Sequence, residues 1–174
     1  DLKGKTAVVT ASTAGIGLAI AEGLARAGAR VVVNGRSDAS VQSALAHLRA
    51  AVPDAGFDGI AADLSDAAGV ARITQHTPAA DILVNNAGIY GLKAFFEIDD
   101  AEWEHYFQMN VMSGVRLARH YLKGMIERNA GRIVFISSES GLNIPVDMIH
   151  YGFTKTAQLS IARGLAKLAA GTNV

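Results

Sequence analysis

The sequence predicts an α/β protein built on a doubly wound parallel sheet, and two patterns carry that prediction. Short runs of β-branched residues alternate with longer segments of helical periodicity, and the connections between them are short. The chain contains 18 Gly but only 3 Pro, which is typical of tight strand-to-helix turns and not of flexible linkers. Right-handed crossovers then place helices on both faces of a single Rossmann-like sheet.

The elements follow from the spacing of apolar residues. Continuous β-branched runs predict buried strands, and apolar residues that recur every three or four positions predict helices. The first helix has Ile16, Ile20 and Leu24 on one face, and Gly28 is suited to its C-terminal end. A single long helix is expected between the fourth and fifth strands. Strands are predicted over residues 6–10, 30–34, 82–84 and 132–136, and a weaker strand, third in chain order, is expected to end at residues 60–62. The predicted helices cover 16–27, 38–50, 67–77, 100–128 and 150–168.

Composition and charge exclude several classes of protein. With 50% apolar and 18% charged residues, the 174 residues are expected to form one folded domain, residues 1–174. The formal net charge of zero offers no electrostatic basis for binding nucleic acid. The absence of cysteine excludes disulfides, cysteine-ligated zinc and a cysteine nucleophile. No segment has the apolar length of a membrane span or a signal-peptide core, so a soluble cytoplasmic protein is expected.

A turn that binds nucleotide phosphates is expected directly after the first strand, at residues 10–17. There, free N–H groups and the dipole of the following helix favour an anion. Gly15 and Gly17 allow close approach of the backbone, while Ser12 and Thr13 add donors. A glycine pair at such a turn is more often only a tight connection. The position between the first strand and a helix therefore carries the interpretation.

Cofactor preference is predicted from the end of the second strand. An acidic residue at this position would accept hydrogen bonds from the adenosine ribose of NAD. Here the segment reads Asn34-Gly35-Arg36-Ser37, with a cation in place of a carboxylate. Arg36 can form a charge-assisted bond to a 2′-phosphate, so NADP(H) is expected to be preferred and NAD(H) remains possible. A solvated surface arginine is the competing interpretation.

Tyr151 and Lys155 lie four residues apart at the start of the last predicted helix, which places both on one face. A free phenol has a pKa of about 10, and a cation about 4 Å away favours the phenolate by about 4 kcal/mol at an effective dielectric of about 20. By itself the pair is a commonplace helical spacing. Ser138, just past the fifth strand, can hold a substrate oxygen, with the adjacent Ser137 as a rival. A serine hydrolase lacks support because there is no G-x-S-x-G turn.

Taken together and in order, these motifs resemble the short-chain dehydrogenase/reductase family, in its single-domain branch of NAD(P)(H)-dependent carbonyl reductases such as 3-oxoacyl-carrier-protein reductase. The match covers essentially the whole chain. Residues 10–17 are similar to the family's T-G-x-x-x-G-I-G cofactor turn, and residues 85–88 match its N-N-A-G segment. Asp63-Leu64 resembles its acidic pair after the third strand. Asn110, Ser138, Tyr151 and Lys155 match its catalytic tetrad.

The resemblance implies hydride transfer between the cofactor and a carbonyl or secondary alcohol, without a metal. Tyr151 would be the general acid/base, activated by Lys155, which would also bind the nicotinamide ribose. Ser138 would orient the substrate oxygen, and Asn110 would hold a water that links Lys155 to a proton relay. Asn110 at a backbone kink and Asn86 as a tie between strands are compatible structural roles. The implied cofactor contacts are Ser12, Thr13, Gly15, Ile16, Gly17, Arg36, Asp63, Leu64, Asn86, Ala87, Gly88, Tyr151 and Lys155.

Two features depart from the family pattern. Ala11 replaces the first motif glycine, and with a negative φ an alanine is expected to fit there, with weaker contact to the pyrophosphate. The sequence stops at Val174, where family members enter a sixth strand, a loop beside the nicotinamide and a segment that covers the substrate. We therefore expect that a C-terminal part is missing, because a bare fragment would expose the flank of the fifth strand.

The resemblance implies a homodimer or homotetramer that uses the long helix and the last helix, with a small-molecule carbonyl or alcohol as substrate. A catalytically impaired nucleotide-binding or scaffold protein on the same fold is the main alternative, and a lyase or epimerase that keeps its cofactor bound is another. The side chains expected to line a site for a hydrophobic ketone are Ile89, Tyr90, Ser140, Ile144 and His150.

Overall fold

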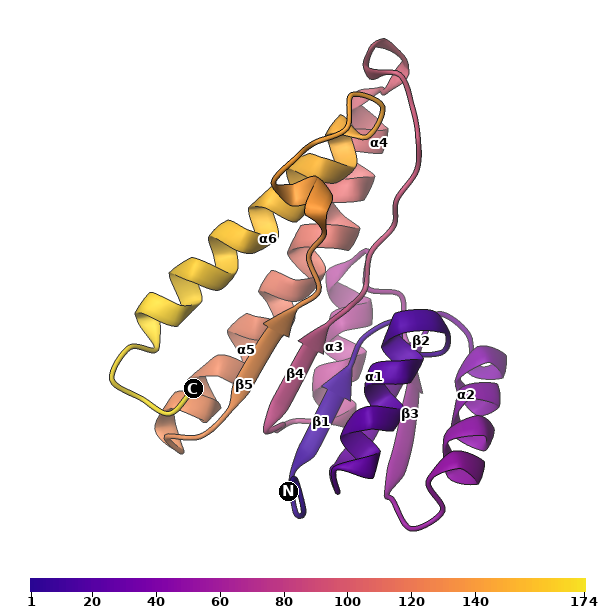
Figure 1. Ribbon diagram of the computed structural model, residues 1–174, viewed down its shortest axis with the longest axis vertical. Coiled ribbons are helices and arrows are strands. Elements are labelled where there is room, and N and C mark those ends of the chain that lie inside the picture. Colours follow the sequence, from indigo (N-terminus) through magenta and orange to yellow (C-terminus); the bar gives the residue numbers. More distant parts are fainter.

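The computed structural model describes residues 1–174 and places a parallel sheet at the centre of the chain (Figure 1). The strands are β1 Thr6–Val9, β2 Arg30–Gly35, β3 Phe57–Ala61, β4 Ile82–Asn85 and β5 Arg132–Phe135. The helices are α1 Gly15–Arg26, α2 Asp38–Ala51, α3 Ala67–His76, α4 Asp100–Phe107, α5 Ser113–Glu127 and α6 Ile149–Leu168. The sheet has five strands in the order β3-β2-β1-β4-β5, all parallel. The predicted doubly wound, Rossmann-like α/β fold is confirmed.

The strand order reverses direction between β1 and β4, which is the switch point of the sheet. In open parallel sheets, ligands bind outside the carboxyl ends of the strands at such a point. The residues after β1, β2, β4 and β5 therefore converge on one edge of the sheet, and the polar motifs of the sequence occupy these connections.

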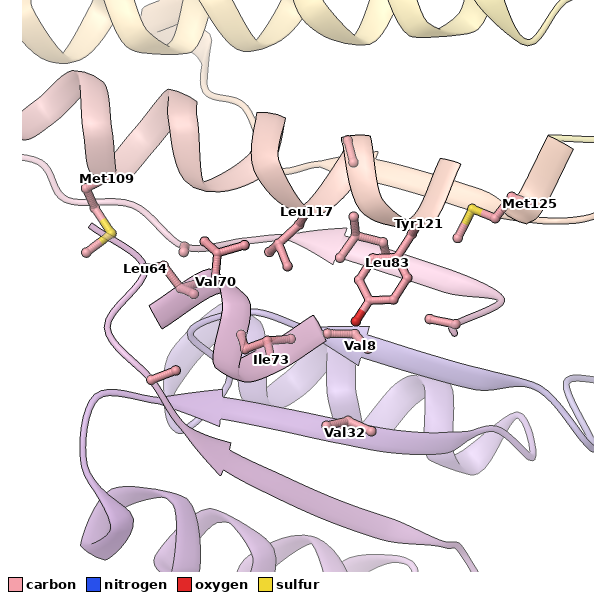
Figure 2. Close-up of a cluster of buried hydrophobic side chains, with 14 residues drawn as sticks. Val8, Val32, Leu64, Val70, Ile73, Leu83, Met109, Leu117, Tyr121 and Met125 are labelled. Atoms are coloured by element: carbon pink, nitrogen blue, oxygen red, sulfur yellow. The ribbon is translucent and has the colours of Figure 1, made fainter. Parts of the chain in front are cut away.

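Two apolar layers hold the helices against the sheet. Valines of β1 and β2 are fully buried, as their continuous β-branched runs predict. On one face, Ala21 and Ala25 of α1 pack with α2 against the sheet. On the other face, α3 and α5 enclose a second layer that includes Leu83, Leu117 and Tyr121 (Figure 2). No helix combines the length and apolar character needed to cross a membrane.

The expected buried face of α1 is wrong at its first apolar residue. Ile16 was expected on the buried face of α1, but its side chain is 66% exposed. The buried positions are instead Gly17, Ala21 and Ala25, and small residues there let α1 approach the sheet closely. Ile16 lies in the first turn of α1, outside the buried positions of that helix.

The long helix expected over residues 100–128 is also corrected. A π-helical segment, Gln108–Met112, separates α4 from α5. The wider turn places Asn110 inside the protein, where its side chain donates to the carbonyl of Ile89 at 2.9 Å and to the hydroxyl of Thr154 at 3.0 Å. Such π segments are frequent at functional sites. Asn110 therefore stands at a local backbone irregularity, which the sequence analysis named as a compatible role.

Tyr121 supplies a test of the core that depends on pH. Its hydroxyl donates to the carbonyl of Thr77 at 2.7 Å, and burial raises the pKa of Tyr121 to about 12. We expect Tyr121→Phe to lower the free energy of unfolding by about 1 to 2 kcal/mol at neutral pH, because the Thr77 carbonyl loses its partner. Denaturant unfolding measures the difference.

The stability difference should shrink at alkaline pH. The unfolded chain ionises Tyr121 at a pKa of about 10, while the folded chain keeps it neutral until about 12. The contribution of Tyr121 is therefore complete below pH 10 and is lost by up to about 1.4 kcal/mol per pH unit above it. A difference that stays constant from about pH 8 to about pH 11 would contradict this account. Tyr90→Phe, at an exposed tyrosine, is the control.

Candidate active site

The turn after β1 is held in shape by a buried asparagine that has no part in the motif. The Oδ1 atom of Asn34 accepts from the backbone N–H of Ala11 at 3.2 Å, and its Nδ2 donates to the carbonyls of Ile60 and Ala62 at 3.2 and 3.1 Å. Asn34 thereby joins the turn to β3 and to the residue that follows it. Asn34 could not be assigned this role from the sequence, because a single amide side chain at a strand end carries no distinctive signal.

Ala11 adopts a left-handed conformation with φ of 47°, contrary to the expected negative φ. The turn requires a conformation that glycine adopts without strain, and the hydrogen bonds at both ends of Ala11 hold the alanine there. A left-handed alanine costs about 1–2 kcal/mol. The turn therefore stores strain at the point where the backbone would approach a pyrophosphate.

We expect Ala11→Gly to raise the free energy of unfolding by about 0.5 to 1 kcal/mol, since relief of strain exceeds the extra entropy of the unfolded chain. Ala27→Gly is a matched control, because Ala27 is exposed and its φ of −79° suits any residue. The control should instead lose about 0.5 to 1 kcal/mol. Equal effects of the two substitutions in denaturant unfolding would contradict the assigned strain.

Two polar residues at this turn, one within it and one from the segment after β4, serve the fold. Ser12 was expected to donate to phosphate, but its hydroxyl is fully buried and donates to the carbonyl of Val9 at 2.6 Å, while its N–H donates to the carbonyl of Asn34 at 2.8 Å. Both of its donors are therefore committed, which corrects that expectation. Asn86 donates to the carbonyls of Thr10 and Ala11 at 3.0 and 3.1 Å, so it ties β4 to the turn after β1.

A glycine makes that tie possible. A Cβ atom on Gly17 would lie 2.5 Å from the carbonyl oxygen of Ala11 and 2.5 Å from Nδ2 of Asn86. Any side chain there would push α1 away from the turn. The close approach that the sequence analysis assigned to Gly17 is thus present, and its immediate partners are protein atoms.

A cleft of about 270 Å³ runs along the edge of the sheet between the turn after β1 and the turn after β4. Arg36 is exposed at its border. Asp63 is exposed too and lies within the range of the Arg36 charge. The hydrogen bond from the Ser65 N–H lowers the pKa of the Asp63 carboxyl, and the charge of Arg36 acts in the same direction. The cleft is lined by Ala11, Thr13, Ala14, Asn34, Gly35, Arg36, Ala62, Leu64, Ala87, Gly88, Ile89 and Met109.

At the other end of this edge, the first turns of α6 bring Tyr151 and Lys155 together. The Nζ atom of Lys155 lies 5.6 Å from the centre of the Tyr151 ring. The Lys155 side chain is only 5% exposed, and burial lowers the pKa of Lys155. Nζ donates to the carbonyl of Ile136 at 2.8 Å and to Oε1 of Gln158 at 3.3 Å. The ammonium is therefore fixed beside the phenol.

The two serines after β5 are distinguished by their hydrogen bonds. The hydroxyl of Ser137 donates to the main-chain carbonyl of Lys155 at 3.2 Å, so it is committed to holding α6. The Oγ of Ser138 accepts from the N–H of Ser140 at 3.1 Å, which leaves its own proton available to donate. The geometry favours Ser138 over its rival as the group that can hold a substrate oxygen.

Three polar residues connect α6 to the π-helical segment: Asn110, Thr154 and Gln158. The Oδ1 of Asn110 accepts from the Ile89 N–H at 2.7 Å, and its main-chain carbonyl accepts from Nε2 of Gln158 at 2.6 Å. The amide of Gln158 thus connects the main chain of Asn110 with the ammonium of Lys155. Thr154 and Gln158 were missed because, in sequence, they are ordinary polar residues on a helix.

The residues expected to line a substrate site are only partly brought together. The ring of Tyr90 lies 6.2 Å from that of Tyr151, and Tyr90 is 78% exposed. His150 does not belong with them. It is fully buried, its ring lies 4.2 Å from that of Tyr106, and burial lowers the pKa of His150. The helical turn directs His150 toward α4 while its neighbour Tyr151 faces the sheet edge, which corrects the expectation.

Proteins of similar sequence and structure identify the family of this chain. Residues 5–174 match the family model described as short chain dehydrogenase. The chain is 48% identical over 174 residues to the uncharacterized oxidoreductase YvaG of Bacillus subtilis, covering 100% of this chain and 66% of that protein. A crystal structure of a 3-oxoacyl (acyl-carrier-protein) reductase from Agrobacterium tumefaciens C58 with NADP bound is 33% identical, with a TM-score of 0.91, and covers 99% of this chain.

The crystal structure of L-sorbose reductase from Gluconobacter frateurii, complexed with NADPH and L-sorbose, is 34% identical, with a TM-score of 0.89. The match with the sorbose reductase covers 95% of this chain and 64% of the reductase. The match with the reductase from Agrobacterium covers 67% of that reductase. The chain thus spans about two thirds of the length of the relatives that it matches. A family match over nearly all of its residues, together with the fold, shows that the chain belongs to the short-chain dehydrogenase family.

Proposed function

We propose that this chain carries the reacting centre of an oxidoreductase that transfers a hydride between NADP(H) and a carbonyl or secondary alcohol. The observation that carries the proposal is the buried ammonium of Lys155, fixed 5.6 Å from the ring of Tyr151 at the edge of the sheet where the cleft opens. Burial of a charged lysine costs stability, and such groups are found mostly at functional sites. Stabilisation of the Tyr151 phenolate is a function that the charge of Lys155 can serve here.

The residues of the cleft fit a dinucleotide that bears a 2′-phosphate. Arg36 offers a planar cation at the end of β2, and Thr13 adds a hydroxyl. Gly88 borders the cleft beside Lys155 and Asn110, since a Cβ there would be in van der Waals contact with Nζ of Lys155 at 3.6 Å and Oδ1 of Asn110 at 3.4 Å. Solved relatives with NADP or NADPH bound support the same preference, and NAD(H) remains the second choice.

In the proposed mechanism, the bound cofactor supplies the hydride in reduction and accepts it in oxidation. Ser138 donates a hydrogen bond to the substrate oxygen and orients it. Tyr151 gives its hydroxyl proton to that oxygen as the carbonyl carbon is reduced, and takes the proton back in the reverse direction. Lys155 stabilises the resulting phenolate through its charge and holds the nicotinamide ribose with its remaining N–H.

The oxidoreductase is also proposed to assemble from copies of this chain. An apolar groove between α5 and α6, lined in part by Leu122, Ile126 and Ile161, supports a homodimer or homotetramer formed through these helices. The substrate is proposed to be a small carbonyl or alcohol compound. The names of the relatives suggest 3-oxoacyl thioesters and ketoses as probes.

One observation favours a second candidate function. The strained Ala11 lines the cleft where the backbone would contact a pyrophosphate, and its methyl group takes up space that a glycine would leave to the phosphates. A nucleotide-binding or scaffold protein with little turnover is therefore the alternative. Oxidation of NADPH in the presence of acetoacetyl-coenzyme A or L-sorbose separates the two, because a scaffold protein binds NADPH and leaves it unoxidised.

The cofactor assignment is tested by Arg36→Ala. We expect the affinity for NADPH to fall about 10- to 100-fold, because one charge-assisted interaction contributes about 1.5–3 kcal/mol, while the affinity for NADH stays within about twofold. Fluorescence titration of both cofactors measures this. Arg49→Ala, at an exposed arginine of α2, is the control. Equal losses for NADPH and NADH, or none, would contradict the role of Arg36.

A further inference from the structure

Gln158 is a buried polar residue that the proposed chemistry does not use. It lies on α6, three residues after Lys155, and its side chain is 2% exposed. Burial of an amide side chain is costly unless both of its ends find partners. Here both ends do, and the two partners belong to different parts of the reacting centre.

The two ends of the amide are matched to their partners. Nε2 donates to the main-chain carbonyl of Asn110 at 2.6 Å, and Oε1 accepts from Nζ of Lys155 at 3.3 Å. A carboxylate in place of the amide could accept from the ammonium but could not donate to the carbonyl. An apolar side chain of the same length could do neither. Only a carboxamide completes both contacts at once.

The contact between Gln158 and Lys155 fixes one of the three N–H donors of the ammonium. An ammonium has three N–H groups. One is taken by the carbonyl of Ile136 at 2.8 Å and one by Gln158. The third remains for a ligand on the side of Gly88, which borders the cleft. Without Gln158 the ammonium would have one fixed partner and could turn away from the cleft.

We propose that Gln158 is a positioning residue, whose carboxamide joins the Asn110 carbonyl to the Lys155 ammonium and so aims that ammonium at the cleft and at Tyr151. The assignment rests on the proposed function, since it presumes that Lys155 holds the cofactor. It goes beyond that function, because the orientation of Lys155 then depends on a residue outside the tetrad Asn110, Ser138, Tyr151 and Lys155. The alternative is a structural role, in which Gln158 only ties α6 to the π-helical segment.

Two variants and a control separate these roles. Gln158→Met keeps the length of the side chain and removes both contacts, whereas Gln158→Glu keeps the acceptor for Lys155 and loses the donor to Asn110. Leu165→Ala, further along α6, removes packing against the core without touching Lys155. The measurements are the carbon-13 shift of the Lys155 Cε followed against pH, the dissociation constant for NADPH and the thermal midpoint. Lys155→Met assigns the signal in a lysine-labelled chain.

We expect Gln158→Met to lower the pH at which Lys155 loses its proton, because an acceptor that favours the charged form is gone. The affinity for NADPH should fall about tenfold, which corresponds to one hydrogen bond of about 1.4 kcal/mol. Gln158→Glu should raise the pH of that proton loss and keep the affinity within about threefold. Leu165→Ala should lower the thermal midpoint and leave the signal of Lys155 at its wild-type pH.

A loss of thermal stability in Gln158→Met with an unchanged Lys155 signal and unchanged affinity would overturn the proposal in favour of the structural role. If Gln158→Met does not fold, an unchanged Lys155 signal in Gln158→Glu overturns it equally. The carbon-13 titration needs neither cofactor nor turnover. A wild-type chain that binds no NADPH would therefore count against the proposed function, while the titration still decides the role of Gln158.

Discussion

Tyr151→Phe is expected to lower turnover about 10³-fold while leaving the affinity for NADPH within about twofold. The substitution removes one hydroxyl, and loss of a general acid/base costs typically about 10²–10⁴ in rate. The ring that packs 6.2 Å from Tyr90 and 5.6 Å from Nζ of Lys155 remains. Initial rates of NADPH oxidation and fluorescence titration measure the two quantities.

Tyr90→Phe is the matched control, because it deletes the same hydroxyl from the neighbouring ring. Tyr90 is 78% exposed. Its hydroxyl has no place in the proposed proton transfer, so turnover should stay within about threefold of the wild type. Full turnover in Tyr151→Phe, or an equal loss in both variants, would remove Tyr151 from its role as general acid/base.

Lys155→Met is expected to reduce turnover about 10²-fold and to weaken the binding of NADPH about 10- to 100-fold. The ammonium is proposed to serve both the phenolate and the ribose, and a charge-assisted hydrogen bond contributes about 1.5–3 kcal/mol. The same rate and titration measurements apply. Lys167→Met, at an exposed lysine on the same helix, should change neither quantity. Retention of NADPH affinity in Lys155→Met would exclude the ribose contact.

The same variant gives a pH signature in stability. Burial lowers the pKa of Lys155 below the ordinary value of 10.5. Below the folded-state pKa, both the folded and the unfolded chain hold the proton. Above it, the folded chain releases the proton while the unfolded chain keeps it until about 10.5, so the free energy of unfolding rises with pH in that window. The wild type should therefore gain stability relative to Lys155→Met as the pH rises, and a parallel or falling trend would contradict this.

The parts of the fold that the sequence predicted are those governed by local pattern. Val31, Val32 and Val33 form an uninterrupted β-branched run and are fully buried in a central strand. The break in the long helix could not be predicted, because residues 108–112 have ordinary helical composition. Asn110 adopts its position through hydrogen bonds to Ile89, which is distant in sequence.

The candidate site divides in the same way. Tyr151 and Lys155 were found because four-residue spacing on a helix places them together whatever the tertiary structure. Ser12 was assigned to phosphate because its residue type suits an anion. Its orientation is decided by Asn34 of the neighbouring strand β2, whose N–H donates to the Ser12 hydroxyl at 3.0 Å. Gln158 was missed for a related reason. Its partners are a backbone carbonyl and a lysine, and neither contact leaves a pattern in the sequence.

The most direct test of the central claim is transfer of deuterium from NADPH deuterated at the reactive carbon of the nicotinamide. Each face is labelled in turn, with acetoacetyl-coenzyme A and L-sorbose as probes and mass spectrometry of the product alcohol as the readout. Our account predicts one deuterium on the new carbinol carbon for at least one probe and one labelled face, lost in Tyr151→Phe and kept in Tyr90→Phe. The contradicting result is NADPH that binds with the expected dependence on Arg36 but transfers no deuterium to either probe. That result would exclude hydride transfer to the carbonyl carbon and would favour the nucleotide-binding alternative.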